Sequence, residues 1–222
     1  MKGCLLALGI LVGLVVLVAG FWNLNFYDVH VRYRLTVEVQ DGDQLKTGSS
    51  VVEASYNIEP SWSWSGPNPH VRVVGFEPTV DLGGKGMLFL SFSNATRTPA
   101  EIVERNQHVF CAADDMYCLP FEAYGRPGSA IPAHNYDRKV PLQGLLRQGG
   151  PREVPFADLP ELVRFRDIED WHTRTRVAPR DFIASFGPSV ELRRVILQLT
   201  NDPITPLPDV WPQWLKQQRG GV

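Results

Sequence analysis

The sequence predicts a mainly β protein of the α+β class, in which one N-terminal transmembrane helix precedes a single antiparallel β-rich domain with one or two short helices. The helix is indicated by 17 consecutive apolar or glycine residues that begin at Leu5 and end at Phe21. The first strand is indicated by near-perfect alternation of apolar and polar residues over 29–39 (VHVRYRLTVEV). None of the 18 prolines precedes Pro60, so the first strands contain no residue that cannot donate to a β ladder.

The apolar run lies at the lower edge of the about 17 to 25 residues that a helix needs to cross a bilayer. A cleaved secretory signal is the alternative, because Lys2 precedes the run and the small residues Ala19 and Gly20 end it. The run is longer than the roughly 7 to 15 residues of a signal core. Aromatic residues also follow it, as at a membrane interface, namely Phe21, Trp22, Phe26 and Tyr27. We therefore expect 1–28 to be a retained anchor, rather than a signal segment, with membrane lipid as its partner.

Charge and composition exclude two broad classes of protein. Lys2 is the only charged residue among the first 22, so residues 23–222 carry 21 of the 22 basic side chains and all 24 acidic ones. This acidic excess argues against a nucleic-acid partner bound through bulk positive charge. A hydrophobic fraction of 44% and an aromatic fraction of 10% argue against a disordered chain. We expect no nucleic acid as partner and a folded remainder.

Turn and breaker residues divide this remainder into elements. Asp41, Gly42 and Asp43 supply turn chemistry between the strand over 29–39 and a returning strand over 48–58, which predicts a hairpin. Further strands are predicted over 71–76, 87–93 and 191–200, and a glycine-rich loop over 83–86. A short helix is predicted over 100–110, mostly loop over 120–160, a helix or strand over 159–165 and an extended arm over 203–214. Without repeats or a Gly/Ser linker, 29–222 reads as one globular domain with a Pro-rich C-terminal arm.

Cysteine usage bears on the compartment. Cys111 and Cys118 are the only cysteine pair in the predicted domain, and they could close a short disulfide loop in an oxidising compartment. Two unpaired buried thiols are the alternative. With the apolar N-terminus, this pair favours a single-pass membrane protein whose domain lies outside the cytoplasm.

The histidines and cysteines offer two weak catalytic constellations. His108, Cys111 and Cys118, with Asp114 and Asp115, could bind zinc or supply a nucleophile and base, but neither paired ligand spacing nor a fourth ligand is visible. His134 with Asp137 could act as a general base in a loop. P-loop, dinucleotide, nucleophile-elbow and zincin motifs do not occur in the sequence. We therefore assign no catalytic, metal or cofactor-binding residue, and no cofactor.

Arginine and tryptophan mark two candidate binding surfaces. If their segments are strands, Arg164 with Arg166 and Arg174 with Arg176 each share one face, where guanidinium groups could hold an anion or a lipid headgroup. Acidic residues lie between these pairs and on to Arg194, which favours salt bridges. Trp62 and Trp64 lie on the same side of an extended segment, where they could contact a protein partner or pack in the domain.

The ends of the predicted domain, YRLTVEV with GSSVVE and DPIT with WPQWL, resemble small membrane-anchored proteins of bacteria without an assigned activity. The resemblance implies a location and no mechanism. The function that we expect is a non-catalytic binding or accessory domain at the cell envelope, with a protein partner. One alternative is an envelope hydrolase or metal-dependent enzyme that uses His108 or His134 with a nearby Asp. The other is an anion or lipid-headgroup binder that uses the arginines between Arg164 and Arg194.

Overall fold

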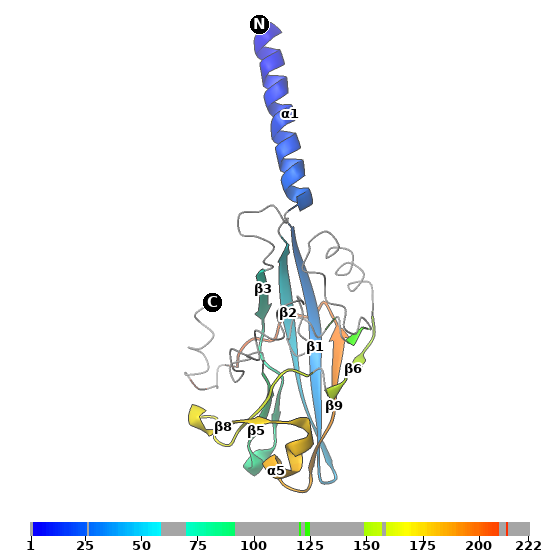
Figure 1. Cartoon of the computed structure of the whole chain (residues 1–222), viewed down its shortest axis with the longest axis vertical. Coiled ribbons are helices and arrows are strands. Elements are labelled where there is room, and N and C mark those ends of the chain that lie inside the picture. Colours follow the sequence, from blue (N-terminus) through cyan, green and yellow to red (C-terminus); the bar gives the residue numbers. More distant parts are fainter. Residues whose placement is uncertain are drawn as a thin grey trace, which may run out of the picture.

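The computed structural model describes residues 2–25, 27–58, 70–91, 120, 123–124, 149–156, 159–208 and 212. The described chain is mainly β, with few helices (Figure 1), which confirms the predicted class. Its helices are α1 (Lys2–Asn25) and α5 (Phe182–Phe186), with 3₁₀ turns η1 (Gly83–Lys85), η3 (Trp171–Thr173) and η4 (Pro179–Asp181). Its strands are β1 (Tyr27–Asp41), β2 (Gln44–Ile58), β3 (His70–Val74), β4 (Thr79–Asp81), β5 (Met87–Leu90), β6 (Arg152–Val154), β7 (Leu162–Phe165), β8 (Arg174–Val177) and β9 (Val190–Leu199).

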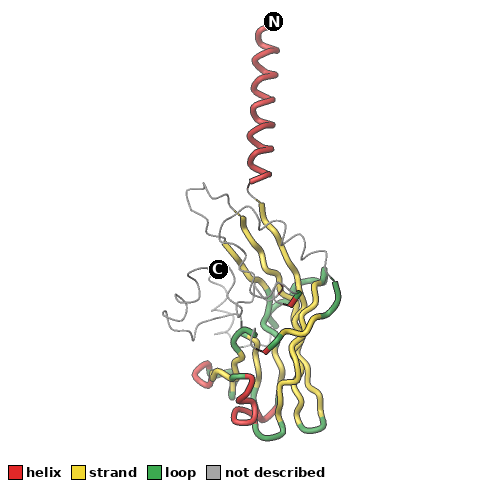
Figure 2. The backbone as a smooth tube through the Cα atoms, turned by 45° about the vertical axis from the view of Figure 1, so that its right-hand side comes forward, coloured by secondary structure: helices red, strands yellow, loops and turns green. Residues whose placement is uncertain are grey.

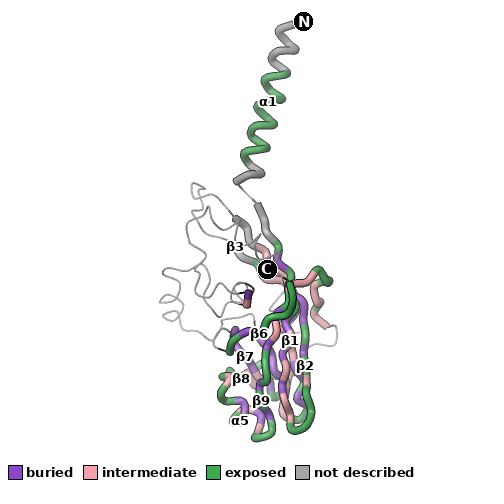
Figure 3. The backbone as a smooth tube through the Cα atoms, turned by 90° about the vertical axis from the view of Figure 1, so that its right-hand side faces the viewer, coloured by how far each residue is buried: buried purple, intermediate pink, exposed green. Residues whose placement is uncertain are grey.

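The strands form two antiparallel sheets. The first has the order β3-β2-β1-β9-β6, and the second has the order β4-β5-β7-β8. Side chains from both sheets join one main core, including Leu35 of β1, Leu197 of β9, Leu88 of β5 and Leu162 of β7. The two sheets therefore pack as a sandwich, because each needs the other to cover its apolar face (Figures 2 and 3).

The hairpin of β1 and β2 forms the long axis of this sandwich. Asp41 pairs with Gln44 across a two-residue turn, in which Gly42 has a φ of 59° that favours glycine. The alternating apolar residues of β1 are fully buried, as the sequence pattern predicts: Val31, Tyr33, Leu35, Val37 and Val39. The hairpin is confirmed, and both strands, at 15 residues each, extend beyond the predicted ranges.

A β-bulge explains why the alternation over 191–200 is weak. Glu38 pairs with Arg194 and Val39 with Leu192, so Arg193 is the extra residue of β9. The bulge allows Leu192 and Val195 to point into the core although they are three residues apart. The predicted strand is confirmed as β9.

Strand β5 of the second sheet is apolar on both faces. Leu88 and Leu90 of β5 point into the main core, whereas Phe89 joins a second cluster with Phe76, Val163 and Phe165. Leu207 packs against this second cluster. A strand buried on both faces has no polar positions, which accounts for the unbroken run MLFL.

The C-terminal arm continues the edge of the first sheet. Thr205 donates its backbone N–H to Val51 O at 2.9 Å and accepts the N–H of Phe76 at 3.1 Å. Its hydroxyl oxygen accepts the N–H of Val51 at 2.8 Å. Thr205 thereby satisfies the backbone of Val51, which lies beyond the reach of β3 because β3 pairs with β2 only from Glu53 onward.

The structure decides between the alternatives for one predicted segment and corrects another. The segment 159–165, predicted as helix or strand, contains β7, and 83–86 contains the 3₁₀ turn η1. The stretch 120–160, predicted as mostly loop, contains β6, which pairs with β9 and buries Val154 beside Val195. Tertiary pairing with a neighbouring strand outweighs the local Pro and Gly content there. The helix predicted over 100–110 lies outside the described residues.

Helix α1 projects from the end of the sandwich opposite the hairpin turn (Figure 1). Its side chains are described over 9–21, and nine large apolar ones are between 54% and 75% exposed. No helix is long and apolar enough to cross a membrane in the part of the chain that the structure describes.

Candidate functional site

Nine residues that the sequence marks as candidate site residues lie outside the described residues, and their roles stay predictions. They are Trp62, Trp64, His108, Cys111, Asp114, Asp115, Cys118, His134 and Asp137. Among the described residues, no group of three or more His, Cys, Asp and Glu side chains could hold a metal ion.

Arg164 connects three elements of the sandwich. From β7, its Nε and Nη2 donate to the backbone oxygen of Lys85 at 3.0 and 2.8 Å, and its Nη1 donates to that of Ser185 in α5. The guanidinium carbon also lies 5.0 Å from the centre of the Phe186 ring. Arg166, by contrast, is exposed. The guanidinium group of Arg164 thus donates its hydrogen bonds to the protein's own backbone.

Arg174 and Arg176 share one acidic partner. They lie on the same face of β8, as alternation requires, and their Nη2 and Nε atoms are 3.1 and 3.7 Å from the two carboxylate oxygens of Glu161. The Glu161 side chain is only 4% exposed. This carboxylate therefore offsets much of the positive charge that the arginines would offer to an anion.

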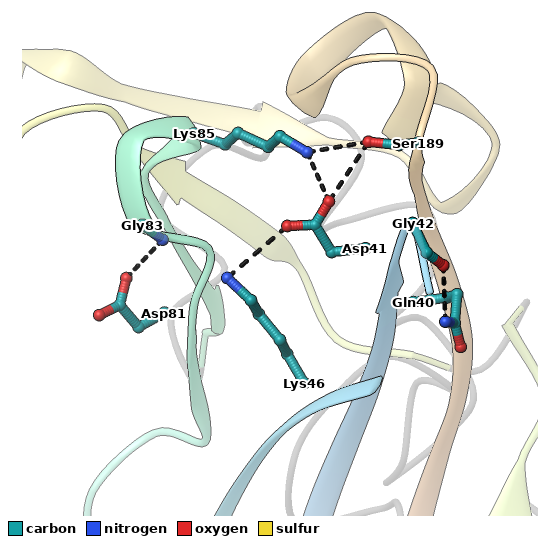
Figure 4. Close-up of polar contacts among 8 residues, drawn as sticks. All are labelled: Gln40, Asp41, Gly42, Lys46, Asp81, Gly83, Lys85 and Ser189. Carbon is teal, nitrogen blue, oxygen red and sulfur yellow. Dashed lines mark hydrogen bonds and ion pairs between the residues drawn. The ribbon is translucent and has the colours of Figure 1, made fainter. Parts of the chain in front are cut away.

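A polar cluster at the hairpin turn, which we call the distal cluster, consists of Asp41, Lys46, Lys85 and Ser189 (Figure 4). Lys85 Nζ donates to Asp41 Oδ1 and, at 2.9 Å, to Ser189 Oγ. Lys46 Nζ lies 3.6 Å from the other oxygen of Asp41. The hydrogen bond from Lys85 is the largest cause that lowers the pKa of the Asp41 carboxyl.

The distal cluster joins parts of the chain that are far apart in sequence. Asp41 ends β1, Lys85 ends η1 and Ser189 precedes β9, while the N–H of Gly42 donates to Ser189 O at 2.8 Å. Sequence reasoning missed this cluster, because only the sheet topology brings these residues together.

The contacts of the distal cluster indicate a structural role. A serine beside a lysine suggests nucleophilic catalysis only if the lysine accepts the hydroxyl proton. Lys85 instead acts as a donor to both Ser189 and Asp41, and the carboxylate accepts from both. The geometry therefore holds the hairpin, the η1 turn and the start of β9 together.

The loop 167–173, which lies within the connection 166–173 between β7 and β8, presents an exposed aromatic pair. The ring centres of Trp171 and His172 lie 4.0 Å apart, and the interplanar angle is 36°. Asp170 Oδ1 accepts from the backbone N–H of His172 at 2.9 Å and contacts its Nδ1 at 3.0 Å. The backbone N–H is the largest cause that lowers the pKa of the Asp170 carboxyl.

No family model matches the chain, and no curated protein or solved structure matches it either. The fold and the contacts described above are therefore the grounds for a functional proposal.

Proposed function

We propose that this chain is a single-pass membrane protein that anchors a non-catalytic β-sandwich, which serves as a binding or accessory domain outside the cytoplasm at the cell envelope. The anchor in this proposal runs from Leu5 to Phe21 within α1. The observation that carries the proposal is the exposed apolar surface of this helix.

That surface is unfavourable in water. Nine large apolar side chains of α1 are more than half exposed, and they follow one another on every side of the helix. Burying one such side chain in an apolar environment contributes about 1.5 to 3 kcal/mol. Lipid supplies that environment around a whole helix, whereas a groove in a protein covers only one face.

The connection to β1 supports a role at a distance from the bilayer. Helix α1 ends at Asn25 and β1 begins at Tyr27, so the sandwich follows the anchor almost without a linker. With a rise of about 3.3 Å per residue, the 15 residues of β1 carry the hairpin turn roughly 45 Å from the helix end. The distal cluster and the loop 167–173 then lie far from the membrane surface.

The polar contacts support binding over catalysis. Among the described cationic groups of the candidate sites, Arg164, Arg174 and Lys85 each donate to a partner within the protein. These contacts stabilise loops and strands and leave the exposed side chains of the sandwich as the surfaces for partners.

Reconstitution of the full chain into sealed lipid vesicles tests the proposal. The protein should float with the vesicles in a density gradient, and external protease should digest the sandwich while a lipid-protected N-terminal fragment of about 3 kDa remains. Protein that stays at the bottom of the gradient would contradict the anchor. In sealed cell-derived membranes of known orientation, digestion from the cytoplasmic side would contradict the proposed location.

A further inference from the structure

We draw no further inference here: the strongest candidate, the outer edge of strand β8 at the rim of the second sheet, carries none because nothing among the described residues shows what would cover it.

Discussion

Gly48 shows how a single residue determines the distance between the two sheets. It lies on the inner side of β2, where a Cβ atom would come within 1.9 Å of the backbone oxygen of Thr79 in β4. Backbone cannot move aside as a flexible side chain can, so the absence of a side chain at position 48 is a packing requirement. The alternating pattern of the hairpin contains no sign of it, because the constraint comes from a strand that is 31 residues away.

Gly48→Ala should destabilise the sandwich by roughly 2 kcal/mol or more, because overpacking forces the sheets apart. Urea unfolding of the full chain in micelles would measure the change. Gly84→Ala is the matched control, since no atom lies within 4 Å of its added Cβ, and it should change the unfolding free energy by less than about 0.5 kcal/mol. Equal effects of the two substitutions would contradict the proposed close approach of β2 and β4.

At the residue scale, the Asp41 carboxyl makes the stability of the fold depend on pH. The hydrogen bond from Lys85 lowers the pKa of its carboxyl from the ordinary value of 3.8. A carboxyl whose pKa is lower in the folded state adds stability above its unfolded pKa, and this contribution is lost as the pH falls below about 4 toward the folded pKa.

Asp41→Asn should therefore lower the urea midpoint at pH 7, and the difference from the wild type should shrink as the pH falls from about 4 to 2. Asp43→Asn changes a neighbouring carboxylate that makes no ion pair with another described residue, and it should alter the midpoint less. An Asp41→Asn difference that is the same at pH 7 and pH 2.5 would exclude the contact with Lys85 as its cause.

At the scale of elements, the local residue pattern predicted those strands whose two faces differ in burial. Strand β1 has one buried face and one solvent face, so its alternation is visible in the sequence, whereas the bulge weakens the alternation of β9. The sequence analysis did not predict strand β6, and it predicted the C-terminal arm without its pairing. Each of these depends on a distant neighbour. The contacts of Arg164 and the distal cluster were missed for the same reason. The bulge at Arg193 also became visible only through the pairing register.

Arg164 gives the clearest prediction for an element. Its donors hold α5 and the η1 turn against β7, and hydrogen bonds from a charged group contribute about 1.5 to 3 kcal/mol each. Partial exposure reduces that figure, so Arg164→Met should lower the unfolding free energy by about 2 kcal/mol. Arg166→Met makes the same change two residues away at an exposed side chain and should cost less than about 0.5 kcal/mol.

Faster amide hydrogen exchange in α5 of Arg164→Met, and not in α5 of Arg166→Met, would show that the lost stability includes the attachment of α5. Equal exchange in both variants would show that packing of Phe182 and Phe186 alone holds α5.

At the scale of the whole molecule, the apolar helix and the sandwich place their apolar side chains in different surroundings. The sandwich buries its own apolar surface between two sheets, whereas the side chains described in α1 remain exposed. The sequence predicts a membrane anchor from its unbroken apolar run, whereas no helix among the described residues is long and apolar enough to cross a membrane.

The central proposal is that α1 holds the protein in a membrane, and retention under alkaline carbonate extraction tests it most directly. Leu11→Asp with Val15→Asp places two carboxylates on one face of α1, at a cost of about 3 kcal/mol each for insertion. Leu45→Asp with Ile183→Asp makes the same changes at sandwich residues of similar exposure. We expect the wild type and the sandwich variant to remain in the membrane pellet and the α1 variant to be released. Retention of all three proteins, or release of all three, would contradict the claim.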